Sequence, residues 1–171
     1  MTLIEIGGKR PQIAPDCFVA ANATLSGDVE LAEGCSIWFG ASIRAEYEKV
    51  RMGIRSNIQD NCTVHTDEGY PCTIAENVSI GHGAIIHGAT IGSNCLIGMG
   101  AILLNGSRVG ANSIIGAGAL LVQGTAVPER SLVLGSPAKI ARTVTDQEIE
   151  KIARNAEHYY GFRATYLLRK I

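Results

Sequence analysis

The six-residue period of this chain is clearest in residues 97–121, which read IGMGAILLNGSRVGANSIIGAGALL. Within this stretch an aliphatic residue returns at every sixth position: Ile97, Leu103, Val109, Ile115 and Leu121. A step of six residues rotates a position by about 240° around an α-helix, so these residues could not share one helical face. A flat antiparallel sheet places its turns about every 8–12 residues. The period therefore indicates a chain that turns a corner after each short strand.

The same period covers most of the chain and predicts its architecture. Three units would complete one coil of a triangular prism, with the aliphatic residues stacked inward and successive coils about 4.8 Å apart, the usual inter-strand spacing. We therefore expect a mainly β fold, a parallel β-helix over residues 1–134. The other aliphatic positions of the period are Ile13, Val19, Leu25, Leu31, Ile37, Ile43, Met52, Ile58, Val64, Ile74, Ile80, Ile86, Ile91, Val127 and Val133.

The repeat ends near Pro128 and Pro137, and a helix is expected after them. Residues 145–148, TDQE, have the form of a capping box, in which the first and last residues satisfy each other's backbone N–H groups. Residues 135–171 are thus predicted to form a connecting segment and a C-terminal helix packed on the β-helix, within one domain. The apolar stripe at helical spacing is Ile149, Ile152, Ala153, Ala156 and Tyr160.

A small residue follows most of the aliphatic residues by four positions, and four of the five cysteines occupy this slot: Cys17, Cys35, Cys62 and Cys95. We interpret them as packed thiols, because free cysteine is among the most buried residue types. No closely spaced pair of cysteines suggests a Cys-based zinc site. Cys72 lies in an insertion, and the pattern assigns it no role.

Charge and composition narrow the classes of partner. The chain carries 15 Lys and Arg against 16 Asp and Glu, a formal net charge of -1. This balance gives no basic field for nucleic acid or for an anionic membrane. Because there is also no apolar run of membrane-spanning length and no cleavable signal, we expect a cytoplasmic protein whose partners are small molecules, with neither nucleic acid nor membrane among them.

Two insertions, around residues 45–51 and 66–73, interrupt the period, and insertions into a repeat scaffold are where function concentrates. Three of the four histidines lie close to the second insertion. His65 follows Val64 and His87 follows Ile86, three units later, so both are expected on the same face of adjacent coils. Two imidazoles at that spacing suit one zinc ion, whose tetrahedral donor atoms lie roughly 3.4 Å apart.

His82 belongs to the preceding unit and therefore to another face. It could share a metal ion with His65 and His87 only if it came from a neighbouring molecule. Such a contact joins two different patches of identical chains, and it must close into a ring. A triangular prism around a threefold axis gives a homotrimer with metal sites between subunits. Three neutral His ligands with an open fourth position are typical of a catalytic zinc site.

The chain resembles the γ-class carbonic anhydrase family of hexapeptide-repeat proteins over nearly its whole length. The resemblance rests on NIQD (57–60), HTD (65–67), IGHGAIIHG (80–88), IGMG (97–100) and GSPA (135–138). The last motif is shared with hexapeptide acyltransferases. The resemblance implies a left-handed β-helix, a homotrimer, and a metal ion, zinc with iron or cobalt as alternatives, held by His65 and His87 of one subunit and His82 of the next.

The activity that the resemblance implies is reversible hydration of carbon dioxide to bicarbonate by a metal-bound hydroxide. In the family pattern Gln59 orients that hydroxide, Asn57 helps to position the substrate, and Asp60 holds the local hydrogen-bond network. Arg44 forms an ion pair across the interface near the site, and Tyr159 reaches the rim of the pocket.

This chain departs from the family pattern at two places. Glu46 stands where the family usually has Asp, two residues after the interface Arg. The acidic loop that carries a proton-shuttling Glu in the archaeal prototype is short here, so Glu48, Asp67 and Glu68 are the candidates to replace it.

Two other functions stay open on the same scaffold. An acyl-CoA thioesterase or acyltransferase could use His82 or His87 as its base, although the stacked pair of histidines would then have no explanation. A non-enzymatic trimer acting as a scaffold is the third possibility. Metal content separates the first function from the other two.

Overall fold

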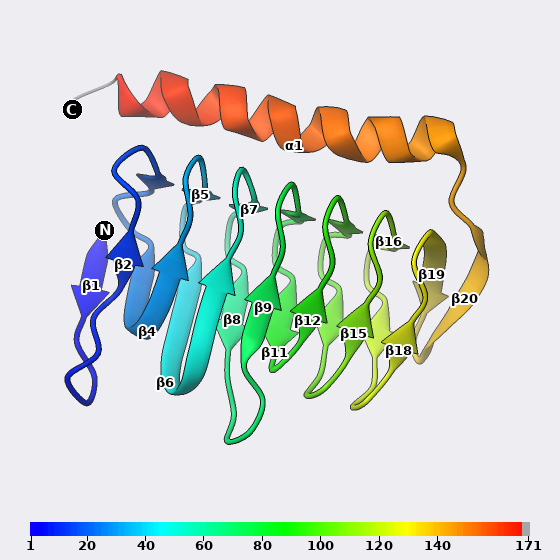
Figure 1. The fold of residues 1–171 in the computed structure, drawn as a ribbon, viewed down its shortest axis with the longest axis horizontal. Coiled ribbons are helices and arrows are strands. Elements are labelled where there is room, and N and C mark those ends of the chain that lie inside the picture. The colour runs from blue at the N-terminus through cyan, green and yellow to red at the C-terminus, as the bar shows by residue number, and fades with distance from the viewer. Residues whose placement is uncertain (169–171) are drawn as a thin grey trace.

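The computed structural model describes residues 1–168, and in it the chain winds into a parallel β-helix whose coils stack along one axis (Figure 1). The predicted mainly β fold with a C-terminal helix is confirmed. Residues 169–171 of the predicted C-terminal segment lie outside the described residues. In the described part of the chain, no helix combines the length and the apolar composition needed to cross a membrane.

The first face of the prism is an eight-stranded sheet. Its strands pair in parallel except for the last two, which are antiparallel, and residues 138–143 of that pair lie in the segment expected to be a connection. In order along the sheet they are β3 (Phe18–Val19), β5 (Ser36–Ile37), β7 (Asn57–Ile58), β10 (Ser79–Ile80), β13 (Leu96–Ile97), β16 (Ile114–Ile115), β19 (Ser131–Gly135) and β20 (Ala138–Thr143).

The second and third faces are joined into one sheet by two long strands, β4 (Thr24–Leu31) and β6 (Ser42–Met52), which pass through a corner. The rest of the second face is β1 (Thr2–Ile4), β8 (Thr63–His65), β11 (Ile85–His87), β14 (Ile102–Leu103) and β17 (Leu120–Leu121). The rest of the third face is β2 (Gln12–Ile13), β9 (Cys72–Ile74), β12 (Thr90–Ile91), β15 (Arg108–Val109) and β18 (Ala126–Val127).

The core consists of aliphatic ladders along the three inner faces. On the first face Ile37, Ile58, Ile80, Ile97 and Ile115 lie in register on successive strands, and each is 0% exposed. Many corners are made by residues that tolerate a left-handed backbone. Asn61, Asn77, Asn94 and Asn112 all have positive φ, between 53° and 59°.

All five cysteines are free and buried, so the interpretation as packed thiols is confirmed. The structure also places Cys72, which the sequence analysis left without a role. Cys72 pairs with Val50 on the third face, two residues before the ladder residue Ile74, and therefore occupies the same small-residue slot as the others. The insertion hides this slot when positions are counted forward from the preceding aliphatic residue, Val64. The slot is recognised when positions are counted back from the following one, because Cys72 lies two residues before Ile74.

The two insertions take different forms. The first lies inside β6: its register with β4 shifts so that Gly27 faces Ala45 while Val29 faces Val50, and residues 46–49 form a bulge. The second is a short loop closed by Asp67 and Tyr70, whose backbone groups pair at 3.3 and 2.8 Å. We call residues 66–71 the hairpin loop.

Helix α1 (Asp146–Leu167) begins with the predicted capping box and lies along the first face (Figure 1). It contacts β3, β5, β7 and β10. Ile152, Ala156 and Arg163 are its buried residues, whereas Ala153, expected on the apolar stripe, is exposed. The face of the helix that contacts the β-helix carries residues 152, 156 and 163. Ala153 follows Ile152 and is therefore rotated by about 100° away from this face.

Truncating one ladder residue is expected to destabilise the fold strongly. Ile115→Ala leaves a cavity between two neighbouring ladder residues, so unfolding free energy should fall by about 2–5 kcal/mol. The measurement is urea unfolding followed by circular dichroism. Ile54→Ala is the matched control: Ile54 is 50% exposed, and its loss should change stability by about 0.5 kcal/mol or less. Equal effects of the two substitutions would contradict the ladder core.

The capping box predicts a pH dependence. The Arg142 guanidinium, bonded at 2.8 Å to both carboxylate oxygens, and then the Thr145 N–H lower the pKa of Glu148 to about 2. A carboxyl whose pKa is lower in the folded state stabilises the fold above its unfolded pKa, and that stabilisation disappears as the pH falls toward the folded value.

Glu148→Gln should therefore reduce stability at neutral pH, and its difference from the wild type should shrink on acidification toward about pH 2. Thermal unfolding across this range measures it. Gln147→Ala, one residue earlier, removes no titrating group and should give a difference that does not vary with pH. A constant difference for Glu148→Gln would show that the Glu148 charge does not stabilise the helix start.

Candidate metal centre

The residues proposed from the sequence fall into two groups on different parts of the prism. Arg44, Glu46, His65 and His87 lie on the second face, and we call this group the paired-histidine half-site. Asn57, Gln59, Asp60, His82 and Tyr159 lie on the first face, at its following corner and on α1, and we call this group the single-histidine half-site.

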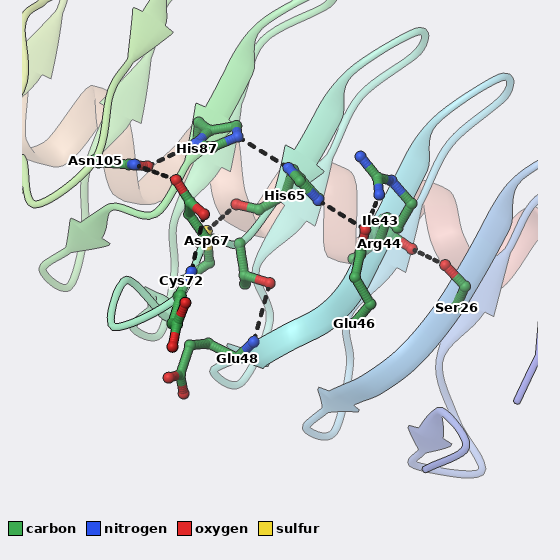
Figure 2. A network of polar contacts seen from close by, with 12 residues as sticks. Ser26, Ile43, Arg44, Glu46, Glu48, His65, Asp67, Cys72, His87 and Asn105 are labelled. Carbon is green, nitrogen blue, oxygen red and sulfur yellow. Dashed lines mark hydrogen bonds and ion pairs between the residues drawn. The ribbon is translucent and has the colours of Figure 1, made fainter. Parts of the chain in front are cut away.

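The parallel register of the second face stacks the two histidines. His65 on β8 pairs with His87 on β11, and Arg44 on β6 pairs with His65 on its other side. Nδ1 of His65 lies 2.9 Å from Nε2 of His87, and the ring centroids are 4.8 Å apart (Figure 2). The prediction that both occupy one face of adjacent coils is confirmed. The separation is close to the donor spacing of about 3.4 Å around a tetrahedral zinc ion.

The outer nitrogen of each paired histidine has an oxygen partner. Nε2 of His65 lies 3.2 Å from Oε1 of Glu46, which belongs to the β6 bulge and also contacts the Arg44 guanidinium. Nδ1 of His87 lies 2.6 Å from Oδ1 of Asn105, whose Nδ2 donates to Oδ2 of Asp67 at 2.9 Å (Figure 2). The two ring nitrogens that face each other are thereby left free of oxygen partners.

The surroundings of His65 favour its neutral form. Burial lowers the pKa of His65, and the charges of Arg44 and His87 lower it further, against the opposite effect of Asp67. A neutral imidazole is the form that binds a metal ion, because its free nitrogen carries the lone pair. The backbone of His65 is held by Cys72, whose Sγ donates a hydrogen bond to the His65 carbonyl oxygen at 3.0 Å.

His82 stands at the corner after β10, away from the paired histidines. Its Nδ1 lies 2.9 Å from Oδ2 of Asp60, and its side chain is 47% exposed. It lines a cavity of about 310 Å³ together with Gln59, Met99 and Tyr159.

A buried chain of hydrogen bonds fixes the amide of Gln59. Its Nε2 donates to Oδ1 of Asn57 at 3.2 Å, and Nδ2 of Asn57 donates to Oγ of Ser79 at 2.9 Å. All three residues are at most 5% exposed. One N–H of the Gln59 amide is used in this way, so its carbonyl oxygen and second N–H are available to the cavity.

Tyr159 reaches the same cavity from α1, and its ring packs edge-on against the Trp38 ring with the two ring centroids 5.5 Å apart. Burial raises the pKa of Tyr159, and the nearby charge of Asp60 adds to the effect. The phenol therefore stays protonated in neutral solution and can donate a hydrogen bond.

Within residues 1–168, no three His, Cys, Asp or Glu side chains of one chain converge in a way that could hold a metal ion. The donor set is nevertheless suited to a zinc-class ion. Each of the three histidines has one ring nitrogen against an oxygen, while its other ring nitrogen has no oxygen partner, which is the arrangement typical of metal-binding His.

Sequence reasoning missed three residues of the site. Ser79 supports Asn57, and Met99 lines the cavity at 61% exposure. Asn105 contacts His87, but the pair Asn105-Gly106 has the composition of an ordinary corner, so nothing local distinguishes it.

The candidate proton-transfer carboxylates belong to the bulge and the hairpin loop. Oε1 of Glu48 accepts a hydrogen bond from the Gly69 N–H at 3.2 Å. The Glu68 N–H and then the Asn105 amide lower the pKa of Asp67. The Glu48 side chain thus joins the bulge to the hairpin loop, and the Asp67 side chain joins the hairpin loop to Asn105 (Figure 2).

Comparisons with known proteins agree with this architecture. Residues 88–123 match the family described as bacterial transferase hexapeptide (six repeats). The chain is 50% identical over 153 residues to the protein named "Probable carbonic anhydrase" of Methanocaldococcus jannaschii. The aligned region covers 90% of this chain and 96% of that protein. It is 46% identical to a carbonic anhydrase of Geobacillus kaustophilus, over 89% of this chain and 84% of that one.

A solved structure has nearly the same fold. The crystal structure of a hexapeptide transferase family protein from Anaplasma phagocytophilum superposes with a TM-score of 0.93 at 36% sequence identity, over 96% of this chain and 98% of that chain. The fold is therefore shared by relatives whose names indicate two different chemistries.

Proposed function

The chain belongs to the γ-class carbonic anhydrase-like family of hexapeptide-repeat proteins, and from this premise we propose that it catalyses the reversible hydration of carbon dioxide to bicarbonate at a metal ion held between subunits. The observation that carries the proposal is the arrangement of the three histidines. Glu46, Asn105 and Asp60 each hold one nitrogen of a different histidine, which leaves the second nitrogen free for a metal ion.

His65 and His87 would supply two ligands from one subunit and His82 the third from the next subunit. The two half-sites lie on different parts of the prism, so a homotrimer in which one half-site meets the other would complete the site three times. The left-handed sense of the β-helix belongs to the same proposal. When bound, a zinc-class ion would lower the pKa of a coordinated water to near 7, so that a nucleophile exists at neutral pH.

The remaining residues act on substrate and on proton positions. The Gln59 amide, held by Asn57, presents a fixed oxygen and N–H to the cavity and would orient the attacking group. Asn57 would position carbon dioxide through this hydrogen-bond chain, and Asp60 holds His82. Tyr159, protonated at neutral pH, can donate to bicarbonate at the rim of the cavity.

The Arg44–Glu46 pair has a role at the edge of the paired-histidine half-site. Arg44 is 53% exposed at its side chain while Glu46 is 19% exposed, so the guanidinium extends from a more buried carboxylate toward the surface that a second subunit would meet. The additional methylene of Glu46 brings its carboxylate to His65 as well as to Arg44. Zinc is the proposed ion, with iron or cobalt as alternatives, because imidazole ligands suit all three.

A second function deserves a test because of the structural relative described as a hexapeptide transferase. An acyltransferase or acyl-CoA thioesterase would use His82, polarised by Asp60 at 2.9 Å, as a general base in the cavity of about 310 Å³. That function leaves the facing nitrogens of His65 and His87 without an explanation. A non-enzymatic scaffold leaves the whole buried Asn57–Gln59 chain without one.

Metal analysis and activity test the proposal directly. Purified protein should contain about one zinc-class ion per chain and accelerate carbon dioxide hydration in stopped-flow assays, with no turnover of a panel of acyl-CoA thioesters. Gln59→Leu should keep the metal and lose activity by about 10²–10³-fold, as expected for loss of one positioned polar group. A protein that stays metal-free after reconstitution would exclude this function.

Mixed trimers test the division of ligands between subunits. His82→Ala chains and chains with both His65→Ala and His87→Ala should each lose the metal ion when assembled alone. In a mixed ring, a chain that keeps His65 and His87 adjoins a chain that keeps His82 at one contact. Mixed trimers should therefore recover one metal ion each, measured by mass spectrometry under native conditions. No recovery in mixed trimers would contradict a shared site.

A further inference from the structure

We propose that Asn105, oriented by Asp67, is a positioning residue that presents Nε2 of His87 to the metal ion. This inference rests on the proposed function, since it concerns the same site. Neither residue would touch the metal ion or the substrate. Together they would determine which nitrogen of His87 carries the proton and where the ring points.

The first step is the orientation of the Asn105 amide. An amide presents either its oxygen or its NH₂ group to a neighbour, and the two ends have nearly the same shape. Nδ2 of Asn105 lies 2.9 Å from Oδ2 of Asp67. An ionised carboxylate only accepts hydrogen bonds, so the NH₂ group must face Asp67. The oxygen of the amide therefore faces His87.

The second step is the tautomer of His87. Oδ1 of Asn105 lies 2.6 Å from Nδ1 of His87 and can only accept a hydrogen bond there. Nδ1 of His87 must consequently carry the proton, which leaves the lone pair on Nε2. Nε2 is the atom that lies 2.9 Å from His65 (Figure 2). The opposite tautomer would direct an N–H into the space that the metal ion would occupy.

His87 differs in this respect from the other two histidines. His65 and His82 contact carboxylates, Glu46 and Asp60, which need no further residue to act as acceptors. His87 contacts a neutral amide, whose orientation depends on a second residue. That second residue is Asp67, which fixes the orientation of the Asn105 amide. This gives a specific role to Asp67 in the hairpin loop.

The surrounding fold is built to hold this pair. The hairpin loop that carries Asp67 is closed by the backbone pairing of Asp67 with Tyr70. A Cβ on Gly88 would lie 2.7 Å from the Tyr70 Cβ and 2.5 Å from Oδ1 of Asn105. Gly88 also has a positive φ of 57°. Glycine at this position therefore makes the room in which the Asn105 amide reaches His87.

The test compares metal affinity in the assembled protein, using zinc and a chromophoric chelator as competitor. Asn105→Leu has a similar size but no acceptor, and it should weaken zinc binding by about 10–100-fold, the usual effect of losing such a partner. Asp67→Leu should also weaken binding, because the Asn105 amide is then free to turn. Gln123→Leu is the matched control: Gln123 contacts the hydroxyl of Tyr70 at 3.4 Å, and it should leave zinc affinity unchanged.

An exchanged pair separates orientation from simple structural support. In the double variant Asn105→Asp with Asp67→Asn, the new carboxylate can accept from His87 and the new amide can donate to that carboxylate. Zinc affinity should return to within a few-fold of the wild type. Loss of affinity in Asn105→Leu that the exchanged pair fails to restore would overturn the inference, as would unchanged affinity in Asn105→Leu.

The tautomer is read separately by ¹⁵N NMR of the metal-free protein at about pH 8, where histidine is mainly neutral. His87 should show Nδ1–H in the wild type and the exchanged pair, and a mixture of tautomers in Asn105→Leu. Nε2–H at His87 in the wild type would overturn the inference. The two proposals can fail separately. If the wild-type protein does not hydrate carbon dioxide but the Asn105→Leu variant binds zinc more weakly than the wild type, the proposed reaction is excluded and the inference about Asn105 stands.

Discussion

Parallel hydrogen bonding between successive coils is the constraint on which the rest of this molecule depends. Most strands contribute two or three residues to a face, and their register with the strands on either side determines which side chains stack on one another. The aliphatic ladders follow from that register because identical positions meet every coil. The contact between His65 and His87 follows from the same register, since β8 and β11 pair them directly.

The fold and the histidine arrangement could be predicted because both depend on period alone. A spacing of six residues is local information, and it assigns each aliphatic residue and each histidine to a face. Local propensity would have failed, since most strands are two or three residues long and are stabilised by their neighbours on adjacent coils. Cys72 and Ala153 show the limits of counting: an insertion obscured the slot of Cys72, and the helix stripe was shifted by one residue at Ala153.

The supporting residues of the site could not be predicted, for a physical reason. Asn105 reaches His87 from the adjacent coil and depends on a glycine at position 88 and a carboxylate at position 67, which are separated in sequence. Glu46 reaches His65 because three additional residues bulge out of β6. Such contacts depend on side-chain reach and on the path of an insertion, and a repeat pattern describes neither.

Helix α1 changes how this elongated stack holds together. In a solenoid each repeat contacts only its neighbours, so coils can separate from either end in turn. Here Arg163 near the end of the helix contacts the carboxylate of Asp16 at 3.3 Å, 147 residues away in the chain, and Arg55 and Arg163 lie at 4.6 and 4.3 Å over the ring of Tyr160. The last element is thereby fastened to the first coils. Separation of the first coils must therefore break contacts made by the C-terminal helix, so the two ends of the chain are coupled in a way that stacking of neighbouring repeats alone does not provide.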